Sequence, residues 1–182
     1  MIGSHIEGLL LQSEESLMVC ANDVATVRTE NNLLHALLVL SSVGYNSIPV
    51  LDQNSHIQGK ISMPMIINGV LKDEDYDWTL LNERKVRDVM DSSVRTLSAD
   101  AEFEDILHML VDQNYLCVAD KNGVFRGIIT RKAMLKRVNF MAHEFERIYD
   151  VQIKEACHPE TKEEYRRDIF TARAKLLRGH AD

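Results

Sequence analysis

Three consecutive polar residues, Thr130, Arg131 and Lys132, end the apolar run of residues 127–129 and open a helix-like sequence. A hydroxyl and two cations at a strand-to-helix junction are groups that bind phosphate, and the free N–H groups of a helix start favour an anion at the same place. The motif therefore predicts an anion site. A solvated surface is the alternative for the two cations, and Thr130 can serve simply as the helix cap.

A second stretch, residues 45–52 (YNSIPVLD), carries groups that could recognise a base. The Asn46 amide and the Ser47 hydroxyl can each donate or accept a hydrogen bond at a polar base edge. Ile48 and Pro49 equally suit the core and the shape of a strand, and the proline indicates an edge strand or an interrupted ladder. Both interpretations remain open for these two residues.

The patterns of the common enzyme chemistries are missing from the sequence. It contains no G-x-S-x-G, no G-x-x-x-x-G-K-[ST] and no C-x-x-C, and none of the seven histidines forms H-x-x-x-H or H-E-x-x-H with a third ligand. No cysteine and histidine pair can be defended as nucleophile and base. We therefore predict no catalytic residues, no metal site and no enzymatic activity.

The composition fits one soluble globular unit, with 182 residues of which 45% are hydrophobic and 27% charged. A formal net charge of -7 argues against a nucleic-acid partner. Three widely separated cysteines suit a reducing compartment, and the start of the chain is acidic where a signal peptide is basic. No apolar run reaches the ~18 residues of a membrane span. We expect a cytoplasmic protein with no membrane partner.

The predicted elements around these stretches form a repeated unit. The first copy is a strand-like run at 17–27, a helix at 33–43 closed by Gly44, strands at 45–51 and 57–61, and a helix at 63–71. VATV at 24–27 returns as VRTL 70 residues later, and Gly59 returns as Gly127 after 68 residues. Two residues are therefore lost between the helix and the following strand of the second copy.

This repeat divides the chain into five predicted parts. They are an N-terminal helical arm (1–16), a first repeat (17–71), an acidic linker (72–85), a second repeat (86–137) and a helical C-terminal extension (138–182). The linker holds the single tryptophan, Trp78, and leads into the helix-like run VRDVM.

The repeated unit resembles the cystathionine-β-synthase (CBS) domain, and its duplication resembles a tandem CBS pair. The shared motifs are h-x-T before the first helix, h-P-V-h-D in the second strand and G-h-h-[ST] before the last helix, over roughly residues 17–137. NDVATVRTENNLLHALLVLSSVGYNSIPVLD and GIITRKAMLK look similar to the cyclic-di-AMP-binding CBS-domain proteins of bacteria. The resemblance implies an α/β fold of two β-α-β-β-α repeats packed as one module, with extra N-terminal and C-terminal helices.

In CBS pairs the ligand clefts lie between the repeats, and the resemblance implies that each cleft combines segments of both. The first cleft would bind the ligand through Ala25, Thr26, Asn46, Ser47, Ile48, Pro49, Thr130, Arg131 and Lys132. A second, weaker cleft would contain Arg95, Thr96, Tyr115, Leu116 and Ser62. Residues 63–65 of the second cleft are Met-Pro-Met where the first has its cations, so we favour the first.

Two departures from the family pattern bear on the ligand. The aspartate that would bind ribose hydroxyls of AMP or ATP is Ala133 in one helix start and Met65 in the other. A cyclic dinucleotide, whose 3′ oxygens are esterified, depends less on that aspartate. Asp23 stands where the relatives carry a basic residue, and its carboxylate would repel a phosphate.

We therefore expect a non-enzymatic regulatory sensor of an adenine nucleotide, most of all cyclic-di-AMP, that needs no cofactor. The resemblance implies a homodimer, and a regulated protein partner such as a metabolic or stringent-response enzyme. Two alternatives stay open: a ligand-free CBS scaffold that binds partners through its C-terminal helices, and a sensor of AMP or ATP.

Overall fold

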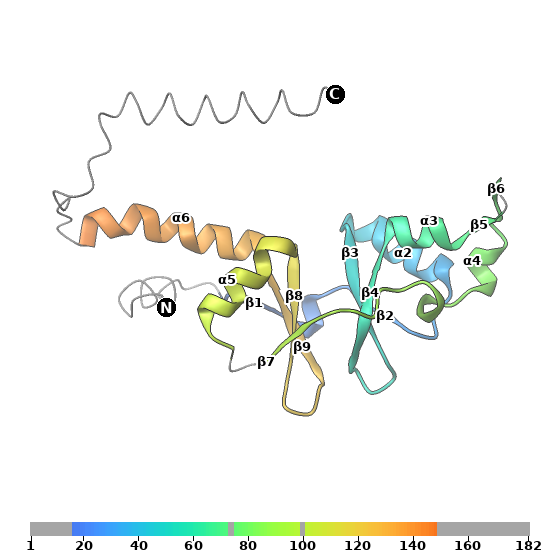
Figure 1. Ribbon diagram of the computed structural model, residues 1–182, viewed down its shortest axis with the longest axis horizontal. Helices are drawn as coiled ribbons and strands as arrows, with labels where there is room; N and C mark the ends of the chain where they lie inside the picture. The colour runs from blue at the N-terminus through green and yellow to red at the C-terminus, as the bar shows by residue number, and fades with distance from the viewer. Residues whose placement is uncertain (1–15, 73–74, 99–100, 149–182) are drawn as a thin grey trace, which may run out of the picture. The chain divides into compact units, whose positions relative to one another are not determined.

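The structure, a computed structural model, describes residues 16–72, 75–98 and 101–148 (Figure 1). The chain divides into a unit of residues 1–144 and a unit of residues 145–182, and both repeats lie in the first. The predicted N-terminal helix and the predicted extension beyond residue 148 lie outside the described residues. In the described part, no helix combines the length and the apolar composition that a membrane span requires.

The first repeat is a three-stranded sheet with two helices, as predicted. Its elements are β2 (Val27–Arg28), α2 (Leu33–Val43), β3 (Ser47–Leu51), β4 (Ile57–Ser62) and α3 (Met63–Gly69). The strand order is β2-β3-β4, with β2 parallel to β3 and β3 antiparallel to β4. The helix predicted at 33–43 is confirmed at both ends, and α3 ends two residues earlier than expected.

Local chemistry explains why α2 begins and ends where it does. The Asn32 side chain accepts the backbone N–H of His35 at 2.9 Å, which caps the helix start. Gly44 adopts φ 66°, a left-handed conformation open to glycine, and its N–H donates to the Leu40 carbonyl at 3.0 Å. Leu33 and Leu40 are fully buried against β3 and β4 in the core of this repeat.

The second repeat has the same order of elements. They are β7 (Thr96–Ser98), α5 (Phe103–Asp112), β8 (Tyr115–Ala119), β9 (Phe125–Thr130) and α6 (Arg131–Ile148). Helix α5 has 10 residues where α2 has 11. The residue after α5 is Gln113, which is extended, whereas α2 is followed by the left-handed Gly44. One residue is lost from the helix and one from the loop, which accounts for the change of offset between the copies.

The strand-like run of residues 17–27 is not one strand, which corrects the prediction. Met18–Cys20 forms β1, Ala21–Asp23 forms a 3₁₀ turn, η1, and the chain then enters β2 of the first repeat. β1 pairs antiparallel with β9, so the second sheet has the order β1-β9-β8-β7. The start of the predicted first repeat therefore belongs to the sheet of the second repeat.

A glycine lies at the place where each sheet pairs with a segment that is distant in the sequence. Gly127 lies opposite Cys20 at φ 153°, and a Cβ there would lie 2.1 Å from the Val19 carbonyl oxygen. In the first sheet a Cβ on Gly59 would lie 2.5 Å from the carbonyl oxygen of Asp91, a residue before β7 that pairs with Lys60. The aligned glycines Gly59 and Gly127 thus each allow the backbone of another segment to lie close to the sheet.

The predicted linker packs on the first repeat. It contains β6 (Asp75–Tyr76) and α4 (Leu80–Glu83). β5 (Leu71–Lys72) spans its start, and the 3₁₀ turn η2 (Val86–Asp88) follows directly after it. Leu81 and Val86 are buried in the core of the first repeat, and Tyr76 stacks on Trp78 with ring centroids 5.5 Å apart. The helix-like run VRDVM forms only the short turn η2.

The two hairpin tips share one design. Asp52 accepts the backbone N–H groups of His56 and Asn54, both at 2.8 Å, and Asp120 accepts those of Val124 at 3.0 Å and Asn122 at 2.9 Å. These backbone bonds are the main reason that the pKa of each carboxyl lies below its usual value. The tips also meet, since the Phe125 N–H donates to the Ser55 carbonyl at 2.9 Å.

A shared apolar cluster joins the repeats into one module. Its buried members are Leu51 from β3, Cys117 from β8 and Phe125 from β9, and Tyr115 and Ile128 pack against them. Each repeat also has its own core, so a face of each sheet is left for the contact between repeats. The predicted packing as one module is confirmed.

Candidate functional site

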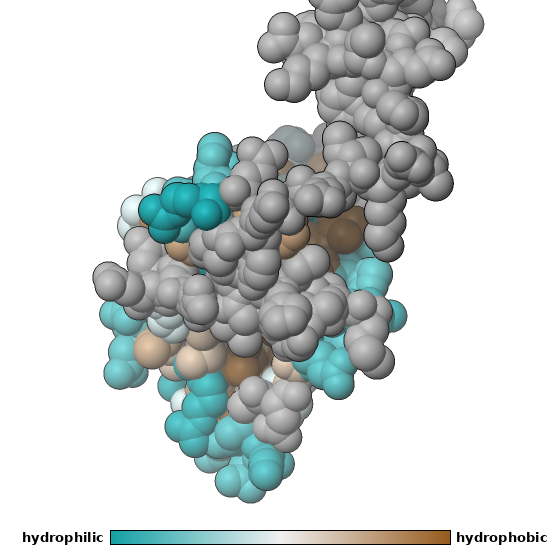
Figure 2. Space-filling model, turned by 90° about the vertical axis from the view of Figure 1, so that its left-hand side faces the viewer, coloured by the Kyte–Doolittle hydropathy of each residue, from teal (hydrophilic) through white to brown (hydrophobic). Residues whose placement is uncertain are grey.

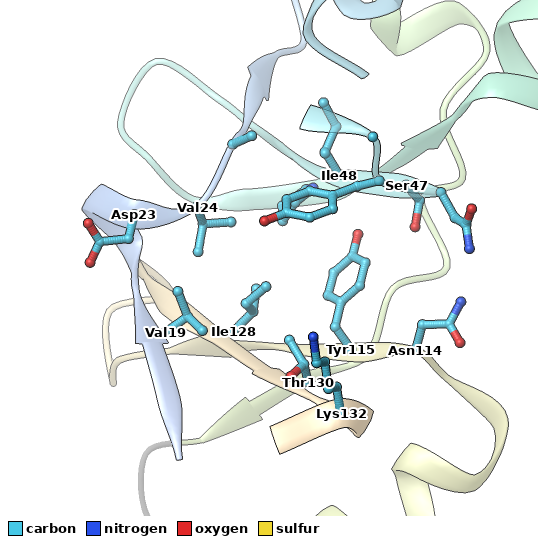
Figure 3. Close-up of a pocket in the computed structure, with 15 residues that line it drawn as sticks. Val19, Asp23, Val24, Ser47, Ile48, Asn114, Tyr115, Ile128, Thr130 and Lys132 are labelled. Atoms are coloured by element: carbon cyan, nitrogen blue, oxygen red, sulfur yellow. The ribbon is translucent and has the colours of Figure 1, made fainter. Parts of the chain in front are cut away.

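A pocket of about 440 Å³ lies where residues of the two repeats meet (Figure 3). That volume falls within the range typical of small-molecule sites. One wall is the segment from β1 to β2, a second is the start of β3, and a third is β8, β9 and the first turn of α6. Seven of the nine residues predicted for the first cleft line it: Ala25, Asn46, Ser47, Ile48, Pro49, Thr130 and Lys132.

The alternation of side chains along β3 and β8 explains which residues reach the space between the repeats. Ile48 and Val50 belong to the core of the first repeat, and Leu116 and Val118 to the core of the second. Successive side chains of a strand point to opposite faces of the sheet. Ser47 and Tyr115, the first residues of β3 and β8, therefore share the face between the repeats.

Arg131 is directed away from the pocket, in contrast to its predicted role. Its Nε–H donates to the carbonyls of Leu110 at 2.8 Å and Gln113 at 3.2 Å, and Nη2 donates to Val111 at 3.1 Å. These carbonyls end helix α5, where a cation is favourable. Arg131 borders a neighbouring surface pocket instead. Thr26, the other predicted residue outside the main pocket, is half-buried just before β2.

The start of α6 offers fewer free N–H groups than the sequence suggested. The Arg131 N–H donates to the Asn114 carbonyl at 2.8 Å, and the Ala133 N–H donates to the Thr130 hydroxyl at 3.1 Å. Thr130 thus has the capping role that we left open. Phosphate recognition in this pocket consequently depends on side chains more than on the helix start.

Lys132 and Asp23 are the charged residues that line the pocket within the described part of the chain. Figure 3 shows them at different edges of the cavity, Lys132 beside Thr130 and Asp23 at the turn after β1. Both are solvent-exposed residues, so neither pays a large desolvation penalty. An anionic ligand would gain from the ammonium group and lose from the carboxylate.

Tyr115 is the main pocket residue that the sequence analysis placed elsewhere. It was assigned to the second cleft, but its side chain lines the first pocket together with Asn114 and Tyr45. Burial raises the pKa of Tyr115 well above its usual value, and the nearby Ser47 hydroxyl opposes this more weakly. The phenol is therefore protonated. The repeat aligns Tyr115 with Ser47, and that alignment together with the two-residue period of a strand could have located it.

The remaining residues of the predicted second cleft lie apart from this pocket. Arg95 and Thr96 are exposed at the start of β7, and Ser62 is half-buried at the start of α3. Leu116 is fully buried in the core of the second repeat, so its side chain is closed to a ligand. The structure thus supports the first cleft more than the second as a place for a bound molecule.

Catalytic groups are not gathered at the pocket. The described residues contain no group of three or more His, Cys, Asp or Glu that could hold a metal ion. Burial raises the pKa of the Cys117 thiol to about 12, so it is protonated at neutral pH and a poor nucleophile. The arrangement is suited to binding a polar molecule.

Two β-α-β-β-α repeats with a pocket between them define a tandem pair of CBS domains, and the chain belongs to the CBS-domain family. The family model "CBS domain" matches residues 86–139, which cover the second repeat. Cyclic di-AMP receptor B of Bacillus subtilis (strain 168) is 34% identical over 139 residues, which are 76% of this chain and 95% of the relative.

Solved structures of similar proteins agree with this assignment. CbpB from Streptococcus agalactiae is 29% identical with a TM-score of 0.74, over 84% of this chain and 96% of that one. Listeria monocytogenes CbpB, solved in complex with c-di-AMP, is 41% identical with a TM-score of 0.65, over 69% of this chain and 94% of its own. The relatives thus include receptors of a cyclic dinucleotide.

Proposed function

We propose that this chain is a non-enzymatic regulatory sensor that binds cyclic-di-AMP in the pocket between its two CBS repeats. The observation that supports this most is the pocket itself, which gathers amide, hydroxyl and ammonium groups from both repeats around one cavity. Asn46, Ser47 and Thr130 supply hydrogen-bonding groups for a base or ribose, and Lys132 supplies the charge for a phosphate. Arg131 lies next to Lys132, and its side-chain hydrogen bonds connect the start of α6 to the end of α5.

Cyclic-di-AMP is a better candidate than AMP or ATP for two reasons. The helix starts carry Ala133 and Met65 in place of an aspartate, so free ribose hydroxyls lack their acceptor. A relative that covers most of this chain is a cyclic di-AMP receptor, and the Listeria relative was solved with that ligand. A single lysine in the pocket also suits two diester phosphates, with one charge each, better than the triphosphate of ATP.

Binding would regulate by shifting the balance between conformations of the module. A ligand held by both repeats stabilises the arrangement in which they are packed as observed, and it can change partner binding only through this difference in affinity. We propose that the chain acts in the cytoplasm as a homodimer that controls a protein partner, for instance a metabolic or stringent-response enzyme. Exposed apolar residues on the helices, including Leu38, Val111 and Leu135, offer surface for these contacts.

One face of the molecule illustrates this surface. Figure 2 shows apolar side chains, in brown, exposed between polar ones, in teal. Of the helices, α5 carries Val111 with 72% exposure and α6 carries Leu135 with 60%. Contiguous apolar surface marks protein interfaces, and we propose that these side chains contribute to such a surface for a second copy or another protein.

Calorimetric titration of the purified chain tests the ligand. We expect cyclic-di-AMP to bind with a Kd of about 1 μM or tighter, and AMP and ATP to bind at least about tenfold more weakly. Tight binding of AMP or ATP alone would contradict the choice of ligand. If none of the three nucleotides binds, the result would favour the scaffold alternative, in which the pocket holds no ligand.

A further inference from the structure

Tyr115 has a buried hydroxyl that makes no hydrogen bond, although the Ser47 hydroxyl lies nearby. In the part of the chain that the structure describes, its Oη is the one buried side-chain nitrogen or oxygen atom that makes no hydrogen bond. Folded proteins pair nearly all of their buried polar groups, and an exception requires an explanation. Phenylalanine would fill the same space without leaving a hydroxyl unpaired, so packing alone does not explain a tyrosine here.

The position of this hydroxyl is fixed by the sheet. Tyr115 pairs with Thr130 across β8 and β9, and Ser47 pairs with Ser62 across β3 and β4. Figure 3 shows the Tyr115 ring extending from β8 into the cavity, with its hydroxyl directed towards the strand that carries Ser47. A group held by a strand in this way is preorganised, which favours ligand recognition because little entropy is lost on binding.

The group can act as a donor. Because the phenol is protonated, Tyr115 offers an O–H to an acceptor that enters the pocket. The same rim carries the amides of Asn46 and Asn114, which can accept from an exocyclic amine. An aromatic ring with an unpaired O–H, beside amide side chains, matches an adenine, whose ring nitrogens accept and whose amine donates.

We propose that Tyr115 is a specificity-determining residue of the pocket, and that its hydroxyl donates a hydrogen bond to a ring nitrogen of the bound adenine. This inference rests on the proposed function. On this inference the hydroxyl serves the ligand and not the fold, because the group becomes paired when the base enters. A site built to hydrogen-bond a ligand rejects analogues that lack the matching group.

The test compares the wild-type chain with Tyr115→Phe, and uses Tyr76→Phe in the linker as a control with the same chemical change outside the pocket. In calorimetry we expect Tyr115→Phe to bind cyclic-di-AMP about tenfold more weakly or worse, and Tyr76→Phe to bind as the wild type does. The thermal unfolding midpoint of unliganded Tyr115→Phe should be unchanged or higher, because the variant loses no hydrogen bond of the folded protein and no longer buries an unpaired hydroxyl.

Analogues of the ligand locate the bond. In one analogue of cyclic-di-AMP, the adenine ring nitrogen that accepts the bond is replaced by CH. The wild type should bind this analogue with lower affinity than cyclic-di-AMP. Tyr115→Phe should bind the analogue and cyclic-di-AMP with the same affinity. Equal affinity of wild type and Tyr115→Phe for cyclic-di-AMP would overturn the inference and leave the proposed function standing. A clear fall of the unfolding midpoint in Tyr115→Phe would also overturn it, since the hydroxyl would then have a structural partner. If the wild type does not bind, the proposed function fails and the inference fails with it.

Discussion

Lys132→Glu is expected to weaken the binding of cyclic-di-AMP by at least about 100-fold. Lys132 is the cation of the pocket, and the only other charged residue among the described lining residues is Asp23. The change removes a charge-assisted contact worth about 2 kcal/mol and adds a second carboxylate near the phosphates. About 3 kcal/mol in total corresponds to that loss of affinity, which calorimetry at fixed ionic strength measures.

The fold should tolerate this change because Lys132 is exposed. Lys121→Glu is the matched control: it reverses the same charge on an exposed residue of the β8–β9 hairpin tip, away from the pocket. Asp23→Asn should act in the opposite direction and tighten binding. Wild-type affinity in Lys132→Glu would show that the phosphates bind away from Lys132, and so outside both the main pocket and the neighbouring pocket beside Arg131.

Gly127→Ala is expected to lower the free energy of unfolding by about 3 kcal/mol. A Cβ at this position would lie 2.1 Å from the Val19 carbonyl oxygen, and φ 153° is a conformation that residues with a Cβ rarely adopt. Overpacking and backbone strain each cost about 1–3 kcal/mol. β1 must move to relieve the overlap, and it leads directly into Asp23 and Ala25, so nucleotide binding should weaken as well.

Chemical denaturation followed by circular dichroism measures the stability of this variant. Gly123→Ala is a control that separates backbone strain from steric overlap. Gly123 also has a positive φ, 80°, but an added Cβ would have His56 Cδ2, at 3.5 Å, as its nearest neighbour. We expect about 1 kcal/mol for Gly123→Ala. If the two variants lose the same stability, the close approach of β1 to β9 at Gly127 does not exist in solution.

The elements with a strong local pattern were predicted well. Helix 33–43 has an apolar stripe, a capping asparagine and a closing glycine, and each of these signals acts within a few residues. The repeat located the counterparts of β2, α2, β3, β4 and α3 in the second half of the chain, including the loss of two residues. The family resemblance implied that each cleft combines segments of both repeats. Neither the periodicity nor the composition of the sequence predicts this arrangement.

Features that depend on distant parts of the chain could not be predicted. β1 is three residues long and has no period of its own, and its partner β9 lies more than 100 residues further along the chain. The direction of Arg131 is set by where the carbonyl end of α5 lies, which the sequence of α6 does not encode. Its neighbour Lys132 has the same local sequence context and lines the pocket.

The prediction that Tyr115 belongs to the second cleft was wrong for a different reason. Motif transfer assigned whole segments to one cleft or the other, whereas adjacent side chains of one strand face opposite sides of the sheet. Leu116 faces the core of its own repeat, and Tyr115 faces the pocket. Applying the two-residue period to the aligned strands would have separated them.

The central claim is that cyclic-di-AMP binds in the pocket between the repeats, and mapping the site by NMR tests it most directly. A series of ¹H–¹⁵N spectra with increasing cyclic-di-AMP is predicted to shift the backbone signals of Ala25, Ser47, Thr130 and Lys132, and to leave those of Arg95 and of the linker residue Trp78 in place. Shifts that gather at Arg95 and Ser62, or at the linker, while the signals of the pocket stay in place, would contradict the account.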